Sequence, residues 1–210
     1  MTLEQNNFPS ILNVWFGGSE AGDAICDVLF GDKVPSGKLS FTMPKAMGQI
    51  PIYYNHLNTG RPLKDGKWFT KFTSNYLDID NEPLYPFGYG LSYTSFAYSN
   101  FTLSSNKMKK GGKVTASVTV TNTGKYDGDE IVQLYIHDKV ASISRPVKEL
   151  KGFQRIHLAK GESKTVYFDI TDDKLQYYNN NYDTEEDPGD FDIMIGPNSR
   201  DVKTQLLTLE

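Results

Sequence analysis

The sequence predicts a protein in two parts: the remnant of an α/β domain, followed by an all-β sandwich of the immunoglobulin or fibronectin III-like type. Three observations support this prediction. Near the N-terminus, a short apolar run, a glycine turn and an amphipathic stripe indicate a strand and then a helix. From residue 96 onward, apolar and polar residues alternate in one short run after another. Between these parts lies a stretch of rings and glycines that fits neither a helix nor a flexible linker.

The N-terminal third, residues 1–44, is predicted to be the end of an α/β domain. Ile11–Phe16 is a short apolar run typical of a buried strand, and Leu39–Met43 alternates as a second strand. Ser19 is the predicted N-cap of the helix between them, and Gly31 its C-terminal cap. The apolar stripe of this helix comprises Ala21, Ala24, Ile25, Val28 and Leu29. Such a unit needs further strands and helices around it, so we expect the rest of its domain to be missing here.

An aromatic-rich connecting segment, residues 45–95, is predicted to follow. Its first part is irregular, and irregular stretches of this length are usually functional or wrapped over a neighbour. Its end runs into Leu84–Phe96, LYPFGYGLSYTSF, which we call the aromatic seam. Pro86 fixes one backbone angle, while Gly88 and Gly90 permit angles that other residues resist. We expect the aromatic seam to be a rigid, largely buried crossing strand.

Residues 96–210 are predicted to form a complete β-sandwich. The expected strands are Phe96–Leu103, Lys113–Asn122, Glu130–His137, Val147–Phe153, Lys164–Ile170, Phe191–Ile195 and Val202–Leu209. About seven short strands in roughly 110 residues are typical of an immunoglobulin-like sandwich. The cysteine pair and the strand tryptophan of antibody domains are absent, which favours the fibronectin III-like branch.

Composition limits the classes of function. The formal net charge of −4 argues against a general nucleic-acid surface, because such domains are usually basic. No apolar run approaches the roughly 20 residues that span a bilayer, and the first residues lack the pattern of a signal peptide. Cys26 is the single cysteine, so an intrachain disulfide is excluded. We expect neither nucleic acid nor a membrane as a partner.

Several groups in the sequence are candidates for a catalytic or ligand site. Glu20 and Asp23 share one face of the helix, but the helix dipole lowers the pKa of a first-turn carboxyl, which does not suit a general acid. We therefore interpret both as helix-start residues that stabilise. Cys26, beside the apolar stripe, is interpreted as a buried, inert thiol. Gly17-Gly18-Ser19 before the helix is only a weak signal for phosphate binding, because the full glycine fingerprint is missing.

The histidines and the acidic run also favour structural interpretations. His56, His137 and His157 are far apart and share no metal-ligand spacing, and the last two are expected on the surface at strand ends. An acidic run suggests calcium but lacks EF-hand spacing, so a solvated hairpin tip is expected. It comprises Asp183, Glu185, Glu186, Asp187 and Asp190. We expect no metal and no cofactor.

The connecting segment supplies the remaining candidates for a binding site: Tyr53, Tyr54, Asn55, His56, Asn58, Arg61 and Trp68. Aromatic rings with interspersed polar groups can stack on the apolar face of a sugar and bond its hydroxyls. The alternative is that these rings only anchor the segment to the core. Both interpretations stay open, with Arg61 and Trp68 as the candidate substrate-binding residues.

Several stretches together resemble one family. SEAGDAICDVLFGDKVPSGKLSFTMP, GQIPIYYNHLNTGRP and LYPFGYGLSYTSF resemble the C-terminal portion of family 3 glycoside hydrolases, most closely the bacterial periplasmic β-glucosidases. KVTASVTVTNTG and SRPVKELKGF resemble the fibronectin III-like domain that ends those enzymes. The resemblance extends from about Ile11 to the C-terminus. It departs at Gly17, where many members carry proline or alanine.

The resemblance implies an activity whose catalytic residues lie outside this chain. Members of the family have a (β/α)8 barrel, an α/β sandwich domain and the fibronectin III-like domain, and they hydrolyse β-glycosides with retention. The nucleophilic aspartate lies in the barrel, and the acid/base glutamate lies upstream of the stretch that looks like Trp15–Gly31. Glu20 resembles a helix-start glutamate that is not the acid/base residue. We therefore expect that none of the catalytic residues lies in this chain.

We thus expect the C-terminal fragment of a β-glucosidase, inactive alone, whose role is structural. Its expected partners are the missing N-terminal barrel and α/β domain, with a β-glucoside as substrate of the whole enzyme, and a homodimer stays open. The family resemblance implies a periplasmic location. The alternatives are a freestanding carbohydrate-binding or protein-interaction module, and a purely structural domain without a ligand. Against both stands the incomplete α/β unit, which would expose strand edges and an apolar helix face.

Overall fold

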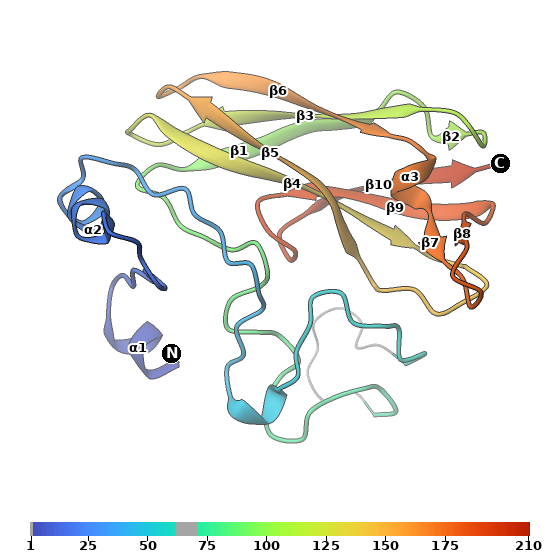
Figure 1. Cartoon of the computed structure of the whole chain (residues 1–210), viewed down its shortest axis with the longest axis horizontal. Helices are drawn as coiled ribbons and strands as arrows, with labels where there is room; N and C mark the ends of the chain where they lie inside the picture. The colour runs from blue at the N-terminus through green and yellow to red at the C-terminus, as the bar shows by residue number, and fades with distance from the viewer. Residues whose placement is uncertain (1, 62–70) are drawn as a thin grey trace.

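The computed structural model describes residues 2–61 and 71–210. In Figure 1, the strands of the sandwich fill the upper part of the molecule. The helices α1 (Thr2–Asn7) and α2 (Ala21–Phe30) lie to one side of it, and the connecting segment, with the short 3-10 helix η1 (Met47–Gln49), hangs below (Figure 1). The N-terminal third and the connecting segment thus extend from the sandwich rather than forming a core of their own.

The part of the chain that the structure describes forms two packed sheets and a small hairpin. Its strands are β1 (Phe96–Leu103), β2 (Lys107–Met108), β3 (Val114–Asn122), β4 (Gly128–Asp138), β5 (Glu149–Leu158), β6 (Ser163–Ile170), β7 (Tyr177–Tyr178), β8 (Thr184–Glu185), β9 (Gly189–Gly196) and β10 (Lys203–Leu209). One sheet has the order β1-β3-β6 and the other β2-β10-β9-β4-β5, while β7 pairs with β8. A short helix, α3 (Asp172–Leu175), follows β6. The predicted fibronectin III-like sandwich is confirmed.

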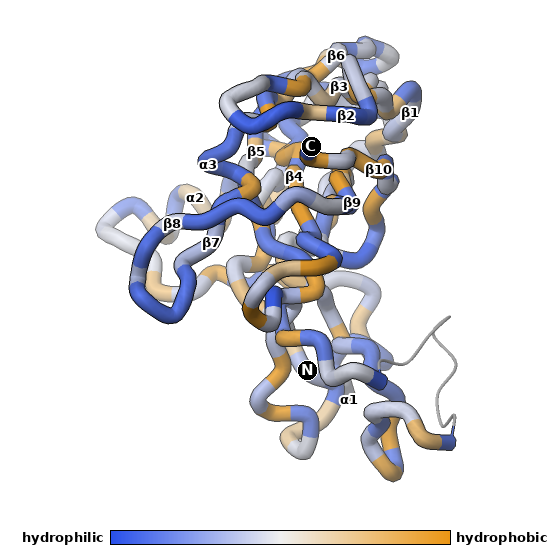
Figure 2. The backbone as a smooth tube through the Cα atoms, turned by 90° about the vertical axis from the view of Figure 1, so that its right-hand side faces the viewer, coloured by the Kyte–Doolittle hydropathy of each residue, from blue (hydrophilic) through white to orange (hydrophobic). Residues whose placement is uncertain are grey.

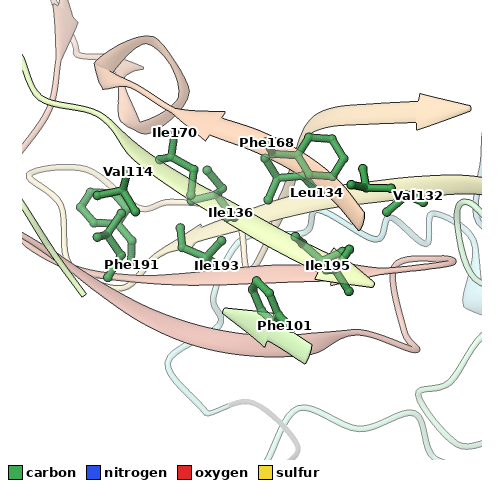
Figure 3. Close-up of a cluster of buried hydrophobic side chains, with 14 of the residues drawn as sticks. Phe101, Val114, Val132, Leu134, Ile136, Phe168, Ile170, Phe191, Ile193 and Ile195 are labelled. Carbon is green, nitrogen blue, oxygen red and sulfur yellow. The ribbon is translucent and has the colours of Figure 1, made fainter. Parts of the chain in front are cut away.

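The hydrophobic core lies between the two sheets. Strand β3 alternates strictly between buried and half-buried residues, and Val114, Ala116, Val118 and Val120 form its buried apolar face. Figure 3 shows how the two sheets meet: Phe168 of β6, from the sheet of β3, points into the same space as Leu134 of β4 and Ile193 of β9 from the opposite sheet. Each of these side chains is almost completely withdrawn from water, and burial of one such side chain contributes about 1.5–3 kcal/mol.

Most predicted strands are confirmed, with shifted ends. Strand β4 is three residues longer than predicted, since it runs from Gly128 to Asp138. Strand β5 begins at Glu149 and continues to Leu158, although the prediction ended at Phe153. Its first six residues are half-buried or exposed with little alternation, so their periodicity gave a weak signal. The two-residue strands and the helices α1 and α3 were not predicted, because segments this short carry no periodic pattern.

The N-terminal third corrects two strand predictions. Residues 11–16 are irregular and exposed, because no neighbouring strand runs beside them in the described residues to receive their backbone hydrogen bonds. Leu39–Met43 is not a strand either, apart from a single bridge between Met43 and Tyr85. Helix α2 is confirmed, and Gly31 closes it in the left-handed conformation, with its N–H bonded to the carbonyl of Val28. The residue at its N-cap is Glu20, not Ser19, and no side chain caps the helix there.

The aromatic seam is anchored but is not a strand. Its backbone bonds to residues 39–43, as in the 2.7 Å bond from Gly88 N–H to the Leu39 carbonyl and the 2.8 Å bond from Leu84 N–H to the Met43 carbonyl. Leu84 and Gly88 are buried, whereas Leu91 is exposed. The prediction of a rigid crossing segment holds for its first half, and the prediction of a continuous strand is wrong, because Pro86 donates no hydrogen bond and the glycines turn the chain.

Candidate functional site

The aromatic seam lies on the outer face of β4, where Gln133 holds it. The Gln133 side-chain amide donates to the carbonyls of Gly88, at 3.1 Å, and Pro197, at 2.6 Å. Its oxygen accepts a 2.5 Å bond from the hydroxyl of Tyr135. Gly88 has φ +79°, and a Cβ there would collide with the Gln133 amide. Only glycine therefore lets the seam approach β4 this closely.

Asn122, the last residue of β3, forms a second anchor. Its amide group donates to the carbonyls of Tyr126, at 2.8 Å, and Leu158, at 3.0 Å. Its oxygen accepts from the Thr94 hydroxyl at 2.6 Å and from the Gly124 N–H at 3.1 Å. All four hydrogen-bonding positions of the amide are thus used, and the side chain is completely buried. This residue joins the end of the seam to the β3–β4 turn.

A buried ion pair forms the third anchor. Lys38 Nζ lies 3.2 Å from Glu130 Oε2 and also donates to the Gly90 carbonyl at 3.3 Å. The other carboxylate oxygen of Glu130 accepts a 2.8 Å bond from the Tyr98 hydroxyl. Burial, followed by the nearby Glu130 charge, strongly raises the pKa of Tyr98, so this hydroxyl stays a donor. The pair joins the N-terminal third to the sandwich, and its charges are both paired and hydrogen-bonded, as buried charges require.

Within the connecting segment, Gln49 organises the described part. Its side chain is fully buried, and its amide donates to the carbonyls of Asp80, at 3.0 Å, and Glu82, at 3.2 Å. Its oxygen accepts a 2.6 Å bond from the Lys45 N–H, and Lys45 Nζ lies 2.7 Å from Asp80 Oδ1. The Gln49 carbonyl accepts from the Tyr76 hydroxyl at 2.9 Å. The Gln49 side chain thus connects residues 45–49 to residues 80–82 of the connecting segment.

Tyr54 docks the connecting segment onto the sandwich. Its ring stacks on Phe87 of the seam, with centroids 4.2 Å apart, and meets the Tyr135 ring edge-on at 5.8 Å. Its hydroxyl accepts a 3.3 Å bond from the Leu150 N–H. For this ring, the anchoring interpretation fits the contacts, since its face is covered by another side chain. Tyr53 is different, because it is 63% exposed and its ring remains open.

The other candidates of the connecting segment lie on an open loop. Arg61 is exposed, and its carbonyl accepts a 2.8 Å bond from the Ser74 N–H, which closes the base of the loop. Asn58 uses its side chain locally, accepting from the Gly60 N–H at 2.9 Å. Asn55 and His56 are also exposed. Trp68 lies outside the described residues. The described part therefore neither gathers these side chains into a pocket nor buries them.

The helix residues remain separate from these anchors. Glu20 and Asp23 are exposed at the start of α2, in keeping with a stabilising role at a helix start. Cys26 is exposed, which corrects the prediction of a buried thiol. The reason is that α2 packs none of its residues fully against the rest of the described chain, so its apolar stripe is only half-buried or exposed.

The histidines lie apart in space and bind their own neighbours. His137 Nδ1 lies 3.5 Å from Asp192 Oδ2, and His157 Nδ1 lies 2.7 Å from Asp129 Oδ1, on the surface of the sandwich near strand ends. Among residues 2–61 and 71–210, no group of three or more His, Cys, Asp or Glu side chains is placed to hold a metal ion. Within the same ranges, no helix is long and apolar enough to cross a membrane.

The acidic run is only partly the solvated tip that was predicted. Asp183 is exposed, but the Glu186 carboxylate is buried and lies 2.6 Å from Lys110 Nζ. Asp187 accepts bonds from the Tyr177 hydroxyl, at 2.6 Å, and from the Ser142 N–H, at 2.9 Å. The Tyr177 bond is the larger of the two causes that lower the pKa of Asp187. These carboxylates therefore pair with neighbouring elements, which the acidic composition alone did not reveal.

Sequence reasoning missed the three anchors Asn122, Glu130 and Gln133. A signal existed for Glu130, since it continues the i, i+2 series of Val132 and Leu134 toward the core side of β4. A carboxylate at an inward position needs a partner, and Lys38 supplies it from almost a hundred residues away. Gln133 gave no such signal, because its face of the strand would be read as solvent-exposed.

Comparisons with known proteins agree with this architecture. A model of the glycosyl hydrolase family 3 C-terminal domain matches residues 1–93, and a model of the fibronectin type III-like domain matches residues 130–199. A periplasmic β-glucosidase of Salmonella typhimurium is 54% identical over 203 residues, which are 97% of this chain and 26% of that protein. A β-xylosidase of Formosa agariphila is 44% identical over 206 residues, which are 97% of this chain and 27% of that protein.

Solved structures show the same correspondence. A β-glucosidase from Listeria innocua, in complex with gluconolactone, matches with a TM-score of 0.88 and 43% identity, over 94% of this chain and 27% of that one. A β-glucosidase from Erythrobacter marinus matches with a TM-score of 0.90 and 38% identity, over 100% of this chain and 26% of that one. The chain thus spans about a quarter of the length of these relatives. It corresponds to the C-terminal part of a family 3 glycoside hydrolase, including the fibronectin III-like domain.

Proposed function

We propose that this chain is the C-terminal part of a β-glucosidase that hydrolyses terminal β-D-glucosides with retention. In this proposal, the catalytic aspartate and glutamate lie in the barrel and the α/β domain upstream, and this chain is inactive alone. Its role is to brace the α/β domain so that the two carboxyl groups keep their working distance. Displacement of catalytic groups by about 1 Å can reduce a rate by about a hundredfold, so such bracing affects the rate directly.

The observation that carries the proposal is the set of buried anchors between the two parts of the chain. Asn122, Glu130 and Gln133 all belong to the sandwich, and all bind the seam or Lys38. A sandwich without its N-terminal neighbour would deprive each of these groups of one buried partner, namely Thr94, Lys38 and Gly88, at a cost of about 1–3 kcal/mol each. The sandwich is therefore built to hold the chain that precedes it. As a division of the chain, we propose 1–44, 45–95 and 96–210.

The N-terminal third offers an apolar surface to the rest of the α/β domain. Figure 2 shows apolar residues along the chain outside the sandwich as well as within it. The exposed large apolar side chains of this part include Ile11, Leu12, Val14, Trp15, Phe16, Leu29 and Phe30. So many exposed large apolar side chains in one part of a chain indicate an interface. Its occupant, in our proposal, is the missing N-terminal part of the same enzyme, because the relatives are about four times longer than this chain.

The connecting segment is proposed to reach the mouth of the active site or a subunit interface of a homodimer. Arg61 is exposed at the base of its loop and is free to contact either, and Trp68 belongs to the same stretch. Replacement of Arg61 or Trp68 by Ala in the whole enzyme tests this part. A changed KM or a changed oligomeric state is expected, and unchanged kinetics together with an unchanged oligomeric state would refute it. A periplasmic location is proposed from the name of the Salmonella relative.

Activity and binding assays on the purified chain separate the alternatives. We expect no cleavage of an aryl β-glucoside, since both catalytic carboxyl groups would be absent. Turnover well above the buffer control would contradict the proposed location of these groups. Titration with cello-oligosaccharides tests the freestanding binding module, for which saturable binding by the isolated chain is required. In the whole enzyme, activity on an aryl β-xyloside should be compared with activity on an aryl β-glucoside, because one relative is a β-xylosidase.

A further inference from the structure

The loop between β4 and β5, residues 139–148, receives the connecting segment. The Val147 N–H donates a 2.9 Å bond to the carbonyl of His56, and Leu57 forms a β-bridge with Pro146. Three residues after Val147, the Leu150 N–H donates to the Tyr54 hydroxyl. A short stretch of the sandwich therefore binds residues 54–57, four residues before Arg61. The position of this loop decides where the open part of the connecting segment begins.

One side chain holds this loop from inside. Arg145 is only 12% exposed, and its Nη2 donates a 2.6 Å bond to Glu149 Oε2 at the start of β5. Its Nε lies 3.8 Å from Asp138 Oδ2 at the end of β4. The face of the guanidinium lies over the ring of Tyr177, 4.7 Å from the centroid. The guanidinium thus contacts both strands that flank the loop and a third element beside it.

The ring under Arg145 is itself fixed. The Tyr177 hydroxyl donates a 2.6 Å bond to Asp187, and the Ser142 hydroxyl lies 2.6 Å from the same phenol oxygen. The Ser142 N–H also bonds to Asp187 at 2.9 Å. Ser142, in the middle of the loop, is therefore bound to the same Tyr177 ring that the guanidinium covers. These contacts hold the loop at Ser142 and at Arg145, just before Pro146.

We propose that Arg145 is a positioning residue, which holds residues 146–150 in the place where the connecting segment docks. The planar fork of arginine bonds a carboxylate in its plane while its face stacks on a ring, and lysine cannot do both. Loss of the guanidinium releases Pro146 and Val147, and with them the docked residues 54–57. The further claim, that the docked segment contacts the substrate or a subunit interface, rests on the proposed function. The docking of residues 54–57 does not depend on that function.

Hydrogen exchange in the full chain tests this inference. The Val147 amide is protected only while it is bonded to His56, whereas the amides of β4 report the unfolding of the sandwich. In Arg145→Lys, we expect the Val147 amide to exchange about tenfold faster or more, with the β4 amides unchanged. Arg155→Lys is the matched control, since Arg155 pairs with Asp129 on the surface and is 63% exposed. Tyr54→Ala, which removes the docked ring, sets the rate for the released segment.

The outcomes are distinct. Faster exchange of Val147 alone supports the positioning role, and equal acceleration of all amides overturns it, because Arg145 would then only stabilise the sandwich. An unchanged Val147 rate also overturns it. If Arg145→Lys does not fold, Glu149→Gln removes the negative charge that faces the guanidinium and is measured in the same way. Hydrogen exchange does not depend on activity. If the proposed β-glucosidase function fails, the positioning role of Arg145 can still hold, and if the positioning role fails, the proposed function can still hold.

Discussion

Replacement of Glu130 by glutamine tests the buried anchor between the N-terminal third and the sandwich. The variant leaves the Lys38 ammonium without its counter-charge, while Tyr98 keeps an oxygen acceptor on the new amide. The Lys38 side chain is 12% exposed, so water compensates little. Removal of one partner of a buried pair costs about 3–5 kcal/mol, and we expect about 3 kcal/mol here, because Lys38 keeps its bond to the Gly90 carbonyl.

Urea unfolding of the full chain measures this loss as a lower midpoint at an unchanged slope. Asp129→Asn is the control, one residue away on β4, and its surface pair with Arg155 predicts a loss of less than about 1 kcal/mol. Combining Glu130→Gln with Lys38→Met should recover part of the loss, since no charge is then left unpaired. Equal effects of Glu130→Gln and Asp129→Asn, or additive effects in the double variant, would refute the buried anchor.

Three further predictions concern the seam, the end of β4 and the core. Gly88→Ala, at φ +79° and against Gln133, should lower the unfolding free energy by more than about 1 kcal/mol in the same urea assay; a neutral result would contradict the close approach. Burial raises the pKa of Asp138 above 3.8, so its contribution to stability is present below the unfolded pKa and is lost as pH rises through the folded pKa. Asp138→Asn should remove this pH-dependent part of the unfolding free energy, as measured by urea unfolding at a series of acidic pH values. An unaltered dependence of the unfolding free energy on pH would disprove the prediction. Leu134→Ala in the fully buried core should cost about 2–5 kcal/mol, and a loss below about 1 kcal/mol would show that the site is not packed as described.

The sequence predicted the sandwich well because alternation with period two is a local signal. In β3, the inward residues from Val114 to Val120 are apolar and the outward ones are polar, so face and register follow from the strand itself. Helix α2 was predicted for the same kind of reason, by its stripe and by Gly31 after it. The resemblance to family 3 glycoside hydrolases, carried by longer motifs, is confirmed by both domain matches.

The sequence could not predict contacts that depend on distant partners. Ile11–Phe16 has the composition of a buried strand, but a strand forms only where a neighbour supplies hydrogen bonds. Cys26 was expected to be buried for a related reason, since the helix face it lies near has nothing fully packed against it in the described chain. Gln133 is polar and looks like a surface residue, yet the seam covers it from 45 positions away.

The candidate site was predictable only in outline. The aromatic connecting segment was identified as a binding or anchoring element, and the structure assigns anchoring to Tyr54 through its stack on Phe87. Sequence alone could not divide the segment in this way, because the division depends on which rings meet the sandwich. The substrate-binding role of Arg61 and Trp68 stays a prediction.

A chimera tests the central claim most directly. The last quarter of the Salmonella typhimurium β-glucosidase, which is 54% identical to this chain, would be replaced by residues 1–210 of this protein. We predict that the chimera cleaves an aryl β-glucoside, whereas the purified chain and the truncated Salmonella enzyme each show no turnover above buffer. Turnover by the purified chain alone would contradict the claim that the catalytic carboxyl groups lie outside it. A folded chimera without activity would contradict the claim that this chain braces a β-glucosidase.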